Sequence, residues 1–336
     1  MKHFFLFLSK RRILQNLLST SGPFKIVSRR FISGEILEEG LNVSRELNRQ
    51  GISATLDYLG ESVQNEKDVF EVIREYLKII NCLISMPKGK TFSELHNFNI
   101  TVSLKLTQLG LAPIPANPAG LSFGRKSGPV ISDAFCLNNI RQVAQEAKRH
   151  QKLITIDMED SPYTDRTLQI YQTLLKEGFS NTGIVIQSYL RRSENDLKNL
   201  LPLGPRVRLC KGAYQEPAHL AFPAKKDVDL NYLKLLEILF SPEALARGSY
   251  PEIATHDEKI INWVINFVKD RRILSEQFEF QMLYGIRRDL QQKLVRQGYR
   301  MRVYLPYGTH WYSYFMRRLA ERPANVLFLL KSLFQR

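Results

Sequence analysis

The stretch LITIDMEDSPYTDRTLQIYQTLLKEGFSNTGIVIQSYL, residues 153–190, decides the fold. It opens with a short run of alternating apolar and polar residues (153–160), continues with a helical pattern (164–178) and closes with a second apolar run (183–190). Short runs of this kind, bounded by turn residues, predict strands, and the longer pattern predicts a helix. This order predicts two parallel strands joined by a right-handed crossover.

The same unit repeats along the chain. Strands are expected at 52–60, 100–110, 153–160, 183–190, 206–214, 252–257, 278–285 and 301–308. Helical patterns follow at 66–85, 134–150, 164–178, 193–200, 226–246, 258–272, 286–298 and 310–320. Because eight parallel strands close a barrel, the sequence predicts an α/β fold, the (β/α)8 barrel. A doubly wound open sheet is the alternative, but the sequence lacks the glycine-rich phosphate loop that such a sheet requires after an early strand.

Two regions depart from the repeat. Residues 1–50 are expected to form a basic N-terminal helical arm, and residues 51–336 the catalytic barrel domain. Residues 111–132 (LAPIPANPAGLSFGRKSGPVIS) are a Pro/Gly/Ser-rich insertion after the second strand. A loop there lies at the carboxyl ends of the strands, where lids and substrate loops are common. The insertion is therefore either a lid or a disordered segment with no role in the site.

Composition indicates a folded, soluble protein, because 44% of the 336 residues are hydrophobic. Three widely spaced cysteines form neither a disulfide framework nor a zinc pattern, so we expect a reducing compartment and no metal. Near the N-terminus the apolar run of residues 4–8 is soon followed by three basic residues. This run is too short for a membrane span or a signal peptide, so we expect no transmembrane segment; a mitochondrial transit peptide remains an alternative.

Positive charge is concentrated at the two ends of the chain. Residues 1–34 contain seven Lys or Arg and no acidic residue, and residues 286–336 contain eleven Lys or Arg against two acidic residues. The middle of the chain is nearly neutral. If the two ends meet in space, they form a cationic surface suited to anionic lipid or nucleic acid. Ordinary solubility is the simpler interpretation.

Polar residues on the expected strands point to a site inside the barrel. Alternation places the apolar side chains toward the helices and the polar ones toward the interior. Five strands then each contribute one polar residue: Lys105, Asp157, Gln187, Arg208 and Gln281. Burying unpaired charge is costly, so this set predicts a ligand or a dense ion-pair network. Its surplus of positive charge predicts a bound anion.

Two further motifs extend the site. In THWYSYFMRRLAERPAN (309–325), Tyr314, Arg317, Arg318 and Glu321 share one helical face. The two guanidinium groups can clamp a carboxylate, with Glu321 holding one of them, although a solvated basic helix has the same pattern. After the fifth strand, Lys211, Gly212 and Ala213 form a small turn of the kind that approaches phosphate.

Ordered motifs then identify a family. They are VSLKLTQLG, ITIDMED, VIQSYL, RVRLCKGAY, IATHD, FEFQMLYG and VYLPYGTHWYSYFMRRLAERPAN. From about Phe31 to Asn325 the chain resembles the proline dehydrogenases, specifically the short monofunctional bacterial form. The resemblance implies oxidation of L-proline to 1-pyrroline-5-carboxylate by hydride transfer to N5 of FAD, the first step of proline catabolism to glutamate. It also implies a membrane quinone as acceptor. Because the basic ends can dock on anionic lipid near that quinone, we expect a cytoplasmic protein, peripheral on the inner face of the membrane, with no nucleic-acid partner.

The resemblance also assigns roles to residues. The carboxylate of proline would be bound by Lys105, Arg317 and Arg318, and its ring enclosed by Tyr214, Leu283, Tyr304 and Tyr314. Cofactor contacts would come from Met158, Gln187, Arg208, Lys211, Gly212, Ala213, Thr255, His256, Gln281 and Glu321. Asp157 and Arg208 would be catalytic, Arg208 near flavin N5 and Asp157 ordering the charged groups. Tyr304 matches the residue associated with proline rather than hydroxyproline.

Some questions stay open at this stage. No general base emerges from the spacing, the insertion is longer than expected for the short enzymes, and the oligomeric state is not indicated. A Schiff-base lyase on the same barrel, using Lys105 or Lys211 as its nucleophile, is one alternative. A basic protein that binds membranes or nucleic acid through its charged ends is the other.

Overall fold

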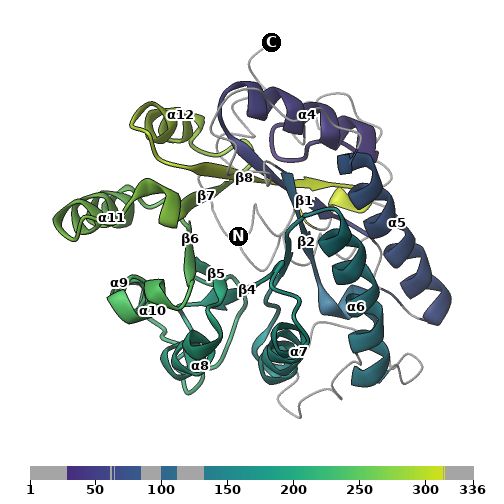
Figure 1. Cartoon of the computed structure of the whole chain (residues 1–336), viewed down its shortest axis with the longest axis horizontal. Helices are drawn as coiled ribbons and strands as arrows, with labels where there is room; N and C mark the ends of the chain where they lie inside the picture. The colour runs from purple at the N-terminus through teal and green to yellow at the C-terminus, as the bar shows by residue number, and fades with distance from the viewer. Residues whose placement is uncertain are drawn as a thin grey trace.

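The computed structural model describes residues 29–60, 63, 65–84, 100–111, 132–312 and 314. Eight strands form a closed barrel in sequence order, and every neighbouring pair is parallel (Figure 1). The strands are β1 (Ser53–Tyr58), β2 (Ile100–Leu104), β3 (Ile154–Ile156), β4 (Thr182–Gln187), β5 (Arg206–Cys210), β6 (Tyr250–Ala254), β7 (Glu279–Leu283) and β8 (Met301–Tyr307). The predicted (β/α)8 barrel is confirmed.

Helices surround the barrel (Figure 1). They are α4 (Leu37–Arg49), α5 (Glu66–Ile84), α6 (Asp133–Arg149), α7 (Thr164–Lys176), α8 (Ser193–Leu200), α9 (Lys225–Leu239), α10 (Pro242–Ala246), α11 (Glu258–Asp270) and α12 (Arg288–Arg296). The single helix expected at 226–246 is two helices, which corrects the prediction. Ser241 accepts a hydrogen bond from the backbone N–H of Ala244, and Pro242 follows in the first turn. A capping serine followed by proline starts a helix, because proline lacks the N–H that an interior position requires.

Helix α4 packs against β1 and β8, where the first and last strands of the barrel meet (Figure 1). Gly40 allows this approach, because a Cβ on it would lie 3.2 Å from Leu56 Cδ2. Ahead of the helix, both the backbone N–H and the Oγ of Ser33 donate to the Pro306 carbonyl, at 2.9 and 3.0 Å. Residues 1–28 and 112–131 lie outside the described residues, as does most of the helix expected at 310–320. The division into arm, barrel and insertion stays a prediction.

The apolar core lies between the strands and the helices, as the alternation predicted. Leu56, Leu104, Ile156 and Leu209 are fully buried there, one each on β1, β2, β3 and β5. Burying one such side chain contributes about 1.5–3 kcal/mol, so this shell stabilises the fold independently of the interior. The other face of the strands points inward and carries the polar residues described below. No helix among the described residues is long and apolar enough to cross a membrane.

Candidate active site

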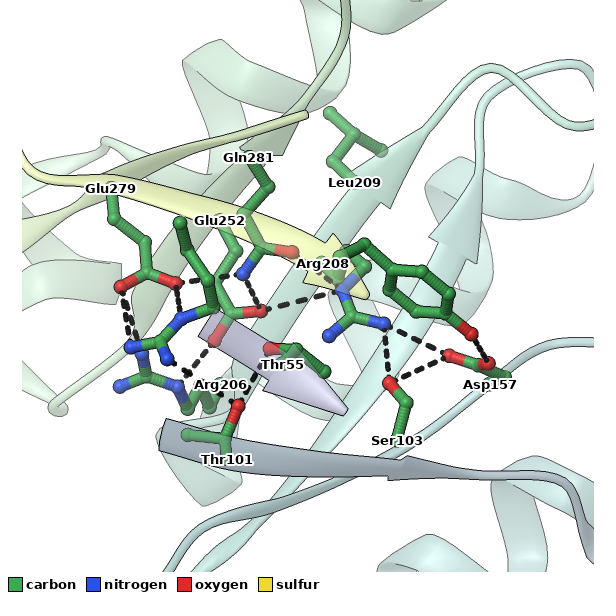
Figure 2. A network of polar contacts seen from close by, with 12 residues as sticks. Thr55, Thr101, Ser103, Asp157, Arg206, Arg208, Leu209, Glu252, Glu279 and Gln281 are labelled. Carbon is green, nitrogen blue, oxygen red and sulfur yellow. Dashed lines mark hydrogen bonds and ion pairs between the residues drawn. The ribbon is translucent and has the colours of Figure 1, made fainter. Parts of the chain in front are cut away.

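Polar side chains of the strands meet inside the barrel in two layers (Figure 2). The lower layer, nearer the amino ends of the strands, consists of Arg206, Glu252, Glu279 and Arg302, one each from β5 to β8. Arg302 binds Glu279 through two contacts, Nε–Oε1 at 2.6 Å and Nη2–Oε2 at 3.1 Å. Arg206 Nε donates to Glu252 and lies against Glu279, with Nη2 3.6 Å from Oε2. Two cations and two carboxylates therefore neutralise one another.

Burial alone would raise the pKa of Glu279, but the charges of Arg302 and Arg206 outweigh it and lower that pKa to about 2. The carboxylate is ionised at neutral pH, and both of its oxygens accept hydrogen bonds. A saturated, balanced layer of this kind is a structural base for the site above it.

The upper layer is organised by Asp157, which lies just beyond β3. Its Oδ1 accepts from Arg208 Nη1 at 2.9 Å and from Ser103 Oγ at 3.2 Å. Its Oδ2 accepts from Tyr304 at 2.6 Å and from Lys105 Nζ at 3.2 Å. Burial raises the pKa of Asp157, but Lys105 and Arg208 overcome it, and the pKa is lowered. With four donors on its two oxygens, Asp157 orders the charged groups and is a poor general base.

Lys105 lies between two carboxylates, 2.7 Å from Asp57 Oδ1 and 3.2 Å from Asp157 Oδ2. Burial lowers the pKa of the ammonium group, but the negative charge of Asp57, followed by the other groups around it, raises that pKa well above its ordinary value. A lysine nucleophile needs a depressed pKa. The geometry therefore disfavours the Schiff-base lyase alternative at Lys105.

Arg208 is held on two sides and left open on a third (Figure 2). Its Nε donates to Gln281 Oε1 at 2.6 Å, and its Nη1 donates to Asp157 and to Ser103 at 2.9 and 2.8 Å. Among the described residues its buried Nη2 has no hydrogen-bond partner, and neither has the buried Oε1 of Gln187. Buried polar atoms without partners are expensive, so these two atoms indicate a ligand at the carboxyl ends of the strands.

The turn after β5 is constrained by its neighbours in the protein, and its contact with a phosphate stays a prediction. Gly212 adopts φ +99°, and a Cβ on it would lie 2.1 Å from the ring of Tyr189, so the ring alone accounts for the glycine. The Lys211 ammonium is 2.5 Å from Asp229 and 2.8 Å from Asp257. Burial raises the pKa of Asp257, yet Lys211 and other partners lower it to about 2. A phosphate bound by Lys211 would have to compete with these two carboxylates.

The loop after β6 is joined to the end of β7. His256 Nε2 accepts from the backbone N–H of Leu283 at 3.0 Å, so this ring nitrogen carries no proton. Thr255 Oγ1 accepts from the backbone N–H of Asp257 at 3.1 Å. The backbone N–H of Thr255 also donates to the Gln281 carbonyl of β7 at 3.2 Å. The cofactor positions expected on β6 and β7 therefore do come together.

The roles of the other expected site residues are less directly supported by the described contacts. Gln187 Nε2 donates to the Met158 carbonyl at 3.4 Å, which connects β4 with the loop after β3. Tyr214 is 39% exposed and Tyr314 is buried, and their contacts with the proline ring stay predictions. Ala213 is exposed in the loop after β5, and its cofactor contact stays a prediction. Three more residues lie outside the described residues, so their roles also stay predictions: Arg317, Arg318 and Glu321.

The sequence prediction did not include Asp57, or the four charged residues of the lower layer, among the site residues. Asp57 shares the inward face of its strand with Thr55, so the alternation carried a signal for it; Glu252 begins the short run expected at 252–257, where no alternation precedes it. Both are buried, at 0% and 2% exposure. Including Asp57 and the whole lower layer corrects the expected positive surplus, because these residues and the predicted ones together make four cations and four carboxylates. These are Lys105, Arg206, Arg208, Arg302, Asp57, Asp157, Glu252 and Glu279.

Comparison with known proteins identifies one family. A family model described as proline dehydrogenase matches residues 41–331. Proline dehydrogenase 1 of Bacillus subtilis (strain 168) is 39% identical over the whole of both chains. Proline dehydrogenase of Deinococcus radiodurans is 39% identical over 92% of this chain and 90% of its own. A crystal structure of proline utilization A from Bdellovibrio bacteriovorus, inactivated by N-propargylglycine, superimposes with a TM-score of 0.76 at 25% identity, covering 88% of this chain and 32% of that one.

Proposed function

This chain belongs to the proline dehydrogenase family, and we propose that it oxidises L-proline to 1-pyrroline-5-carboxylate with FAD bound at the carboxyl ends of the barrel strands. It is an oxidoreductase that catalyses the first step of proline catabolism. The observation that carries the cofactor proposal is the buried guanidinium of Arg208, which is oriented by its neighbours and keeps Nη2 without a partner among the described residues.

The proposed cofactor contacts among the described residues lie on β4, β5 and β7 and on the loops after β3, β5 and β6. When bound, FAD accepts the hydride at N5, and the protein supplies position and electrostatic field. Arg208 would lie near N5, where a fixed positive charge stabilises the electron-rich reduced ring. The remaining contacts would come from Met158, Gln187, Lys211, Gly212, Ala213, Thr255, His256, Gln281 and Glu321.

Lys105 is suited to bind the carboxylate of proline. An ammonium group has three donors, and Asp57 and Asp157 occupy two of them, so one remains for substrate. Arg317 and Arg318 would complete the clamp, and the ring would be enclosed by Tyr214, Leu283, Tyr304 and Tyr314. Replacing Arg317 with Ala should mainly raise the KM for proline. Lost activity at an unchanged KM would contradict this role.

Transfer of a hydride from the carbon next to nitrogen requires a neutral amine, whose lone pair supports the forming imine. Lys105 and Arg208 are already neutralised by carboxylates, so they contribute less to keeping the amine unprotonated than their charges suggest. We assign most of that effect to Arg317 and Arg318. Because the oxygens of Asp157 are occupied, the proton of the amine leaves by another route than this residue.

Electrons would pass from the reduced cofactor to a membrane quinone. The seven basic residues of 1–34 and the eleven of 286–336 would dock the enzyme on anionic lipid at the inner face of the membrane. Co-sedimentation with vesicles containing anionic lipid tests this docking, with neutral vesicles as the control. No binding to anionic vesicles at low salt would exclude it.

The proposed function is tested by an absorption spectrum of the purified protein before and after anaerobic addition of L-proline. A flavin spectrum that bleaches supports both cofactor and substrate. A flavin that stays oxidised would exclude direct reduction by proline. A colourless protein that cannot be reconstituted with FAD would exclude the cofactor.

A further inference from the structure

Gln281 connects the upper layer with the lower one (Figure 2). Its Oε1 accepts from Arg208 Nε at 2.6 Å, and its Nε2 donates to Glu252 Oε2 at 2.6 Å and to Glu279 Oε1 at 2.7 Å. The side chain is buried, at 3% exposure. One amide thus separates the guanidinium above it from the two carboxylates beneath it.

The two carboxylates determine which way this amide points. If the amide of Gln281 were reversed, its NH2 would face the Nε–H of Arg208, and its oxygen would face two carboxylates. The reversed amide would thus place donor against donor and acceptor against acceptor in a buried site, where an unmade hydrogen bond is expensive. The acceptor presented to Arg208 is therefore set by residues that lie below it.

Glu252 differs from Glu279 in a further contact. Its Oε2 lies 3.7 Å from Arg208 Nε as well as 2.6 Å from Gln281 Nε2, while its Oε1 accepts from Arg206. The oxygens of Glu279 instead accept hydrogen bonds from Arg302 and Gln281, and its Oε2 lies 3.6 Å from Arg206 Nη2. Of these two carboxylates, only Glu252 both orients the amide and contacts the guanidinium.

We propose that Glu252 is a positioning residue for the reaction, acting on Arg208 through Gln281. The proposal rests on the proposed function, in which Arg208 lies beside the reacting atom of the flavin. Glu252 holds the Nε side of the guanidinium while Asp157 holds the Nη1 side, which leaves Nη2 as the donor for a ligand. Displacing a group of this kind by about 1 Å can cost up to about 100-fold in rate.

Glu252→Gln is the test, and Glu279→Gln is its matched control. Each change keeps the side-chain volume and replaces a buried carboxylate that accepts from Gln281 and from one arginine. Since an amide has one acceptor where a carboxylate has two, each variant loses one of these contacts. The two variants should therefore unfold at similar temperatures. If Glu252→Gln does not fold, Glu252→Asp withdraws the carboxylate from Gln281 and keeps its charge.

Two readouts separate positioning from a structural role. The first is hydrogen exchange of the Arg208 Nε–H in the ligand-free protein, followed by NMR and assigned with Arg208→Lys. We expect exchange at least about tenfold faster in Glu252→Gln and little changed in Glu279→Gln. The second is anaerobic reduction of bound flavin by proline, in which the limiting rate should fall about tenfold in Glu252→Gln while the proline concentration for half-maximal rate changes less than about twofold.

Equal exchange of the Arg208 Nε–H in the two variants would overturn the proposal, as would equal limiting rates. If the unmodified protein is not reduced by proline, the proposed function fails instead. The exchange measurement needs neither flavin nor proline, so it still decides whether Glu252 holds Arg208.

Discussion

Replacing Asp57 with Asn removes the closest charge partner of Lys105 and preserves the volume of the side chain. The Asp57 side chain is 1% exposed, and its Oδ1 lies 2.7 Å from Lys105 Nζ. Removing one partner of a buried pair typically costs about 3–5 kcal/mol. Because Asp157 remains 3.2 Å from the same ammonium, we expect a loss of about 2–3 kcal/mol in unfolding free energy.

The same change should alter how proline binding depends on pH. Burial lowers the pKa of Lys105, and Asp57 is the largest charge that raises it above its ordinary value. The stability that this raised pKa contributes is complete below the unfolded value and is lost as pH rises through the folded value. Without Asp57 the folded pKa falls, so the KM for proline should begin to rise at a lower pH than in the unmodified enzyme.

Urea unfolding at neutral pH measures the first effect, and the KM for proline between about pH 7 and pH 10 measures the second. The control is Glu177→Gln, which removes the surface ion pair with Arg141 and should cost less than about 1 kcal/mol. If Asp57→Asn were no less stable than this control, the buried pair would carry no net stability. An unchanged pH profile of KM would refute the assigned effect on Lys105.

Three further changes test other parts of the site. Gly212→Ala should cost about 1–3 kcal/mol, because φ is +99° and the new Cβ meets the Tyr189 ring; an unchanged melting temperature would contradict this. Glu279 stabilises the fold above its unfolded pKa, and this contribution of about 3 kcal/mol is lost as pH falls toward about 2. In Glu279→Gln the free energy of unfolding should therefore depend less on pH in the acid range. A pH dependence parallel to that of the unmodified protein would argue against the ion pair. Tyr304→Phe removes a 2.6 Å hydrogen bond to a carboxylate and should cost about 1.5–3 kcal/mol by urea unfolding. Tyr171→Phe is its control, since that buried hydroxyl makes no hydrogen bond to a carboxylate, and equal losses would refute the difference.

Most of the barrel followed from local pattern. The strand expected at 206–214 is β5, and the helix expected at 164–178 is α7, each within a few residues of its predicted bounds. Such elements are predictable because alternation and helical periodicity record which face of a segment is buried. The long helix expected at 226–246 failed because its apolar pattern continues across Ser241 and Pro242, where the backbone stops one helix and starts another.

The candidate site followed less completely. Lys105, Asp157, Arg208 and Gln281 were predicted to share the interior, and the structure brings them into one network. The partners that neutralise them were not all found, and the missing Glu252 changed the predicted charge of the site. The strand expected there begins at Glu252, so no alternation ahead of this residue shows which face it occupies.

By itself, the sequence determined the class of fold, the inward face of most strands and the family, because these depend on residues near one another in the chain or on ordered motifs. Only the tertiary structure decided which charges pair. Closure of eight strands at a particular register brings Asp57 to Lys105 and Glu252 to Arg208, across 48 residues in the first case and 44 in the second. The electrostatics of a barrel interior depend on these contacts, since each buried charge is stabilised by the opposite charge that closure of the barrel places beside it.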